Sequence, residues 1–148
     1  MTDWILNPSG TTPSISAEYT RTTSASWSKT ASRDYVLSSL VDACMNASEF
    51  DWDGYQAQPA QIDAYILTRR LLASLPESIP DPEVDVTPQG KFMLFWQRRV
   101  DHLFSMTVGA DGGLAYAARY GSTRKSGTSI FADFIPQSVL RELFHLYS

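Results

Sequence analysis

Residues 50–59 read Phe50-Asp51-Trp52-Asp53-Gly54-Tyr55-Gln56-Ala57-Gln58-Pro59 and lie between two stretches in which apolar residues recur with helical spacing. Asp53-Gly54 is a turn signal, because glycine adopts the positive φ that a tight turn requires. Pro59 suits the first turn of a following helix, where a missing N–H is harmless. We therefore interpret residues 50–59, the joint, as a helix–helix connection in which Trp52 is buried and Tyr55 is accessible.

Amphipathic helical patterns flank the joint on both sides. The first helix is expected to begin near Ser32, which can cap it, with Asp34 in the first turn. Its apolar stripe comprises Val36, Leu37, Leu40, Val41, Cys44 and Met45. The second helix is expected to end at Pro76. Its apolar face comprises Ile62, Tyr65, Ile66, Leu67, Leu71, Leu72 and Leu75.

From residue 84 the apolar period changes to two, which is typical of strands. Strands are expected at residues 84–86, 91–97, 102–108 and 114–120. Residues 91–97 are apolar on both faces, which predicts the central strand. Residues 121–129 are polar and bounded by glycine, which predicts a loop, and Pro136 opens the last helix. The sequence thus predicts an α+β fold with two N-terminal helices, a four-stranded antiparallel meander and a C-terminal helix packed on one sheet face.

The first 33 residues differ in composition from the rest of the chain. They are rich in serine and threonine and show no helical period, which is typical of a loose arm. Ile15, Ala17 and Tyr19 alternate with polar residues, which instead favours a short edge strand. We expect an arm over residues 1–33 and a single domain over residues 34–148.

The composition indicates a globular chain. Its 148 residues, 43% of them hydrophobic, make one domain of ordinary size. Cys44 is the only cysteine, so no disulfide can form within the chain, and its place in an apolar stripe indicates an inert thiol. No signal peptide is visible, and no stretch approaches the roughly 20 apolar residues of a membrane span. We expect a soluble, cytoplasmic protein.

Charge is unevenly distributed along the chain, whose net charge is −4. Residues 34–85 carry ten acids against two bases, whereas residues 86–148 carry seven bases against four acids. Such asymmetry favours electrostatic steering toward a partner. The candidate partner-binding residues are the acids of the middle segment and the tyrosine of the joint: Glu49, Asp51, Asp53, Tyr55, Glu77, Asp81, Glu83 and Asp85.

The sequence contains no complete motif for binding a metal or cofactor or for catalysis. Glu49-x-Asp51-x-Asp53-Gly54 resembles the start of a calcium loop, but Ala60 stands where that loop needs a bidentate glutamate. The glycine-bounded basic segment at residues 121–127 lacks the order of a phosphate-binding loop. The chain has neither zinc-ligand spacing nor a nucleophile elbow. We therefore expect no cofactor and no metal, and we assign no catalytic residue.

The basic residues of the C-terminal part support an alternative function. A histidine beside arginines could serve a metal-independent nuclease as acid or base and phosphate clamp, and sheet aromatics could stack single-stranded bases. The candidate phosphate contacts are Arg98, Arg99, His102, Arg119, Arg124 and Lys125. A third interpretation is a structural role in which the chain associates with itself through an exposed sheet face.

Trp52-Asp53-Gly54-Tyr55-x-Ala57-x-Pro59, followed by a leucine-rich helix, resembles the Trp-Asp/Asn-Gly-x-x-Ala-x-Pro motif of a family of small, uncharacterised proteins from bacteria, phages and mobile elements. Gly127-Thr128, Phe131 and Ile135-Pro136 also match that family, so the resemblance covers about residues 48–148. It implies hairpins after the motif and a bacterial or mobile-element setting, and it implies no catalytic residue. In that setting we expect a non-enzymatic accessory or inhibitor protein, antitoxin-like or anti-defence-like, that occupies the surface of a partner protein.

Overall fold

The computed structural model describes residues 3–7, 10–12 and 25–148. The chain divides into two compact units, Met1–Ser32 and Arg33–Ser148. In the first unit, β1 (Asp3–Asn7) pairs antiparallel with β2 (Gly10–Thr12). The predicted strand with alternating residues 15–19 lies outside the described residues.

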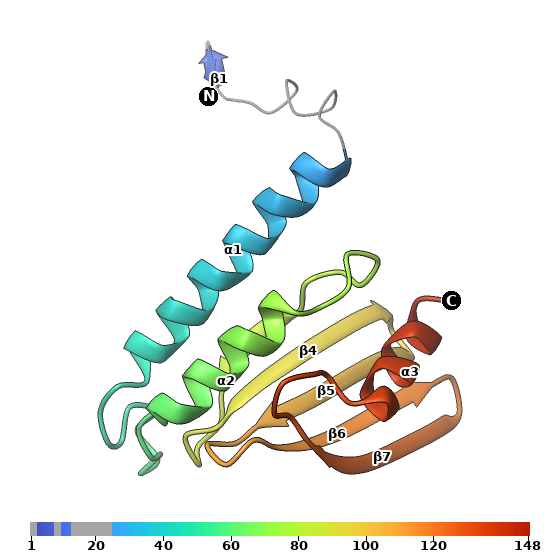
Figure 1. Ribbon diagram of the computed structural model, residues 1–148. Helices are drawn as coiled ribbons and strands as arrows, with labels where there is room; N and C mark the ends of the chain where they lie inside the picture. The colour runs from blue at the N-terminus through green and yellow to red at the C-terminus, as the bar shows by residue number, and fades with distance from the viewer. Residues whose placement is uncertain (1–2, 8–9, 13–24) are drawn as a thin grey trace. The chain divides into compact units, whose positions relative to one another are not determined.

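Two helices precede the large sheet (Figure 1). α1 (Ala25–Asn46) begins before Ser32, because neither proline nor glycine interrupts the sequence between Ala25 and Ser32. α2 (Ile62–Ala73) begins after Pro59. The segment between Pro59 and Ile62 is held extended, because the Gln61 N–H donates a hydrogen bond to the Gly90 carbonyl (2.9 Å). No helix in the described part of the chain has the length and apolar character to cross a bilayer.

The second unit contains a five-stranded antiparallel meander in the order β3-β4-β5-β6-β7. The strands are β3 (Glu83–Val86), β4 (Phe92–Arg99), β5 (His102–Val108), β6 (Gly113–Tyr120) and β7 (Thr123–Ile130). α3 (Gln137–Leu146) follows and contacts β5 and β6, while α2 contacts β4 and β5. The predicted α+β fold class is confirmed.

Two details of the predicted sheet are wrong. Residues 121–129 form most of β7 rather than a loop, because Gly121, with φ of 67°, turns the chain back onto β6. β7 then pairs with β6 along its whole length, from Thr123 to Ile130. The added strand makes β5 rather than β4 the centre of the sheet.

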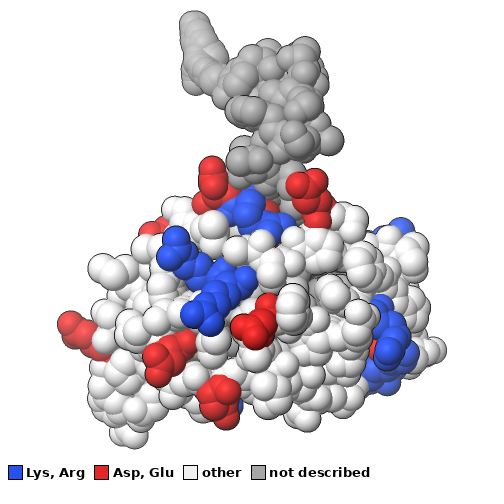
Figure 2. All heavy atoms as spheres, viewed as in Figure 1, with Lys and Arg blue, Asp and Glu red and all other residues white. Residues whose placement is uncertain are grey.

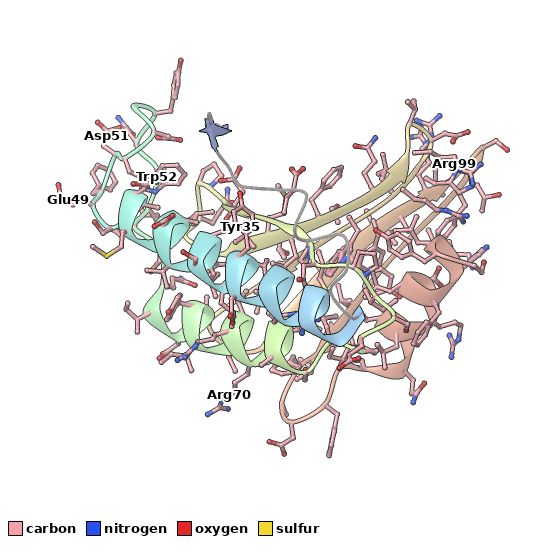
Figure 3. The ribbon with its side chains drawn as sticks, turned by 90° about the horizontal axis from the view of Figure 1, so that it is seen from above. Tyr35, Glu49, Asp51, Trp52, Arg70 and Arg99 are labelled. Carbon is pink, nitrogen blue, oxygen red and sulfur yellow. The ribbon has the colours of Figure 1, made fainter. Side chains whose placement is uncertain are left out.

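The helices cover one face of the sheet and leave the other face uncovered by any described helix (Figures 1 and 3). The covered face supplies most of the core, with Phe92, Trp96 and Phe104 almost completely buried. The indole N–H of Trp96 donates to the Pro80 carbonyl (2.8 Å), so its polar atom is satisfied in the core. Cys44 is half-buried, and burial raises the pKa of its thiol, which fits the predicted inert role.

The uncovered face, called the open face below, consists of the alternate strand residues that point away from the helices. They are Glu83, Asp85, Met93, Phe95, Gln97, Leu103, Ser105, Thr107, Ala115, Ala117, Arg119, Arg124, Ser126, Thr128 and Ile130.

Candidate protein-binding site

Two carboxylates shape the backbone of the joint. Asp51 Oδ1 accepts the N–H of Gln56 (2.6 Å), and Asp53 Oδ1 accepts the N–H groups of Tyr55 (2.8 Å) and Ala57 (3.2 Å). Asp51 and Gln56 adopt positive φ values of 66° and 65°, which non-glycine residues rarely do. The closely spaced acids therefore have a conformational role, as acceptors for loop N–H groups.

Further hydrogen bonds tie the joint to the turn between β3 and β4. The Gln58 N–H donates to the Pro88 carbonyl (2.7 Å), and Gln61 bonds to Gly90 as described above. The indole N–H of Trp52 donates to the Gln58 carbonyl (2.7 Å). Trp52, predicted to be buried, is half-buried against the core, because its polar edge faces this loop. The joint is thus a fixed loop attached to the sheet.

Four large apolar side chains at the joint are exposed to solvent. Met45, at the end of α1, is 69% exposed, and Ile62, at the start of α2, is 63% exposed. Phe50 and Tyr55, within the joint, are 57% and 87% exposed, which confirms the predicted outward position of Tyr55. Scattered exposed apolar residues are normal, but here two lie within one fixed loop and two lie in the helix ends that adjoin it, which suits a binding surface.

Periodicity assigned Met45 and Ile62 to buried stripes. Both residues lie in the terminal turns of their helices, and the sequence pattern cannot show which residues of a terminal turn are covered by the rest of the fold. Among the exposed residues that were not predicted, Phe50 is the one that the sequence could have indicated, because it is an aromatic residue beside acids in a turn-rich segment. The sequence therefore indicated the joint but not all of its exposed members.

The predicted partner-binding acids lie in separate places. Glu49 and Asp51 lie beside Trp52 at the end of α1 (Figure 3). Glu77 is exposed between α2 and β3, and Glu83 and Asp85 are exposed on the open face. Figure 2 shows both signs of charge on the helix-covered face, with uncharged surface between them. The acidic middle segment therefore does not form one continuous acidic surface on that face.

Asp81 is held inside the second unit. Its carboxylate lies 2.6 Å from Nε of Arg33, and its side chain is only 7% exposed. Nη1 of the same arginine donates to the Leu72 carbonyl near the end of α2. Asp81 thus fastens α1 to the segment before β3, and a partner would reach Glu77 or Glu83 more readily.

A depression of about 300 Å³ lies between α1 and β3 next to the joint. Trp52 forms part of its wall, and Asp42 of α1 and Asp85 of β3 contribute carboxylates. Asp42 was not among the predicted partner-binding residues, and it lies outside the apolar stripe predicted for the first helix. The depression extends the surface of the joint toward the edge of the sheet.

The predicted phosphate contacts are also divided among several roles. Nη1 of Arg98 donates to the carbonyls of Leu146 (3.2 Å) and Ser148 (2.7 Å), and so caps the end of α3. His102 Nδ1 lies 2.8 Å from Asp101 Oδ1, and this hydrogen bond lowers the pKa of the Asp101 carboxyl. These side chains stabilise strand and helix ends.

The remaining basic candidates lie at the far end of the sheet from the joint. Arg119 and Arg124 are exposed and stand opposite each other across β6 and β7. Lys125 Nζ lies 3.6 Å from Glu142 Oε2, toward α3. Arg99 is exposed at the end of the sheet opposite Trp52 (Figure 3). Of the six predicted residues, Arg119 and Arg124 are the pair that the open face brings together.

Tyr120 and Glu142 form a buried polar pair between β6 and α3. The Tyr120 hydroxyl lies 2.8 Å from Glu142 Oε1, and His145 stacks on the tyrosine ring with centroids 4.2 Å apart. Burial, reinforced by the neighbouring Glu142 carboxylate, raises the pKa of Tyr120 far above its usual range. The pair fixes α3 to the sheet, because each buried polar group satisfies the other.

Among the described residues, no three histidine, cysteine, aspartate or glutamate side chains are grouped so that they could hold a metal ion. No family model matches the chain, and no curated protein or solved structure matches it either. The functional argument therefore depends on the geometry of the joint and of the open face.

Proposed function

We propose that the chain is a protein-binding module that acts by occupying the surface of a partner protein through the joint. One observation carries this proposal: a loop fixed by hydrogen bonds presents Phe50 and Tyr55 to solvent, and Met45 and Ile62 are exposed in the adjoining ends of α1 and α2. Aromatic side chains on a pre-ordered loop lose little entropy on binding, so their burial contributes fully to affinity. The proposed function therefore needs no chemistry from the chain itself.

The charges around the joint define the chemistry of the partner. Glu49 and Asp51 are exposed beside Phe50, and Asp63 is exposed in the first turn of α2. An apolar cluster with an acidic border is complementary to an apolar groove with a basic border. The acids increase the association rate, and the aromatic residues provide most of the affinity.

The resemblance of the joint to proteins of bacteria, phages and mobile elements suggests the biological setting. In that setting we propose an accessory or inhibitor role of the antitoxin or anti-defence kind. Blocking a partner's surface requires a rigid, accessible contact loop, and the joint meets this requirement. The setting is supported by the motif Trp52-Asp53-Gly54-x-x-Ala57-x-Pro59 and by the later matching residues Gly127-Thr128, Phe131 and Ile135-Pro136.

Replacing Phe50 and Tyr55 by serine is expected to abolish partner capture and leave the fold intact. Each is an exposed anchor, and loss of one interface hot spot weakens binding by about 2 kcal/mol, or roughly 30-fold in Kd. Tagged wild-type and variant chains are incubated with lysate of the source organism, and bound proteins are identified by mass spectrometry. The purified partner is then titrated by calorimetry.

The matched control for these variants is Phe134→Ser. Phe134 is 83% exposed and lies in the segment before α3, outside residues 50–59. This control should bind the partner as the wild type does. Retained binding by Phe50→Ser and Tyr55→Ser, or the same loss in the control, would contradict the assignment to the joint.

Nucleic-acid binding is the alternative function, and one observation favours it. Arg119 and Arg124 face each other directly on the open face, and such a pair could contact successive phosphates. If this alternative holds, wild-type chain retards labelled single-stranded RNA and duplex DNA in a gel at low salt, and Arg119→Ala/Arg124→Ala abolishes the shift. Unchanged mobility with both probes would remove the alternative and leave the proposed function untouched.

A further inference from the structure

The open face carries opposite charges at its two edges. Glu83 and Asp85 are exposed on the edge strand β3, where they pair in register with Phe95 and Met93. Arg119 and Arg124 occupy β6 and the other edge strand, β7. Like charges directly opposite each other on neighbouring strands are destabilising, so the arginine pair favours a bound counter-charge.

The open face is also uneven in shape. Met93 and Phe95 project from β4 on one side of the central strand β5, whereas Ala115 and Ala117 occupy the matching rows of β6 on the other side. Depressions of about 410 and 480 Å³ lie over the β5–β7 half of the sheet. In the rows of Met93 and Phe95, large side chains on β4 and small ones on β6 make the face complementary to itself.

We propose that the open face binds a second copy of the chain, with a two-fold axis that runs between the sheets nearly parallel to β5. Such an axis places β4 of one copy over β6 of the other, and β3 over β7. Phe95 then lies over the second copy's Ala117, and Met93 over its Ala115. The projecting side chains of each copy fill the depressions of the other, as inward-facing side chains do in a β-sandwich.

The same axis pairs the charges of the open face. Glu83 lies over the second copy's Ser126, within reach of its Arg124, and Asp85 lies over its Thr128. At the hairpin end, Lys91 and Asp111 line the depression of about 480 Å³, and the axis brings Lys91 of one copy toward Asp111 of the other. All the charged groups of the face except Arg119 thus gain an opposite charge or a hydroxyl, and Arg119 lies over Gln97.

This pattern distinguishes a second copy from the other occupants of such a face. A phosphate backbone would be attracted to Arg119 and Arg124 but repelled by Glu83 and Asp85 on the same face. An unrelated protein would need large residues opposite the small ones and small residues opposite the large ones. It would also need basic groups opposite the acidic edge and acidic groups opposite the basic edge. A second copy supplies both by symmetry.

Charge exchange provides the test. The full chain is studied by sedimentation equilibrium between about 1 and 100 µM, a range suited to micromolar dissociation constants. The wild type should dimerise. Glu83→Lys/Asp85→Lys makes both edges of the face basic, and Arg119→Glu/Arg124→Glu makes both edges acidic, so each variant alone should dimerise at least tenfold more weakly. An equimolar mixture of the two should restore a dimer that contains one chain of each kind.

The matched controls carry the same change in net charge, but at residues outside the open face. Arg69→Glu/Arg70→Glu on α2 and Asp63→Lys/Asp133→Lys alter exposed residues elsewhere and should dimerise as the wild type does. Circular dichroism confirms that each variant is folded. A wild type that stays monomeric, a dimer that survives both reversals, or a mixture that fails to associate would each overturn the proposal.

The outcome is independent of the proposed function at the joint. Phe50→Ser and Tyr55→Ser should lose partner capture and still dimerise, whereas Arg119→Glu/Arg124→Glu, whose residues lie at the far end of the sheet from the joint, should lose dimerisation and still capture the partner. A monomeric wild type that retards RNA or DNA in an Arg119- and Arg124-dependent way would assign the open face to nucleic acid and reject the second copy.

Discussion

Replacing Gly90 by alanine is expected to lower the free energy of unfolding by roughly 3–5 kcal/mol, because backbone strain and lost hydrogen bonds add together. Gly90 has a φ of 85°, and a Cβ there would overlap the carbonyl oxygen of Pro59. The joint would have to move away from the β3–β4 turn, which would break the Gln61–Gly90 and Gln58–Pro88 hydrogen bonds. Urea denaturation followed by tryptophan fluorescence measures the loss.

Gly54→Ala is the matched control for this prediction. Gly54 has a φ of 79°, similar to that of Gly90, but beyond Gly54 and its two chain neighbours no atom of the described residues lies within 4 Å of the position its Cβ would occupy. Its replacement should therefore cost only the backbone strain of the left-handed conformation, about 1 kcal/mol. Equal losses at both positions would show that close contact between the joint and the turn is not what makes Gly90 necessary.

Replacing Arg33 by methionine is expected to destabilise the second unit by about 3–5 kcal/mol, the usual effect of removing one partner from a buried ion pair. The substitution removes the guanidinium from the Asp81 carboxylate, which is 7% exposed, and it removes the side-chain donor to the Leu72 carbonyl, which keeps the N–H of Leu75 as a donor. Chemical denaturation of the wild type and the variant gives the difference.

The double variant Arg33→Met/Asp81→Leu should recover most of that loss. Nη2 of Arg33 is buried and has no hydrogen-bond partner among the described residues, so the pair itself is costly to bury. Apolar residues of similar volume avoid that cost. A double variant no more stable than Arg33→Met would mean that packing of the arginine stem, rather than charge, provides the stability.

The parts of the fold that periodicity predicted are those with one buried face. α2, α3 and the strands up to β6 alternate between core and solvent, so their apolar spacing reflects the burial directly. β7 has no such pattern, because only Ile130 among its residues is a large apolar side chain and that residue is exposed. Its conformation depends on pairing with β6, which the composition of the strand does not encode.

The candidate site was only partly predictable for a similar reason. The turn at Gly54 and the outward Tyr55 follow from local chain chemistry within a few residues. The ion pair that holds Asp81 involves an arginine 48 residues away, so the sequence showed an available acid where the fold has a buried one. The use of the Asp51 and Asp53 carboxylates as acceptors for loop N–H groups depends on loop φ values that the sequence pattern does not specify.

The polar composition of β7 has a consequence for aggregation. An edge strand of eight residues presents unpaired N–H and C=O groups that could recruit further chains into a growing cross-β assembly. Arg124 and Lys125 in its first half, with only one large apolar residue in the strand, oppose such growth through charge repulsion. The features that made this segment look like a loop thus protect the meander from fibril formation at its last strand.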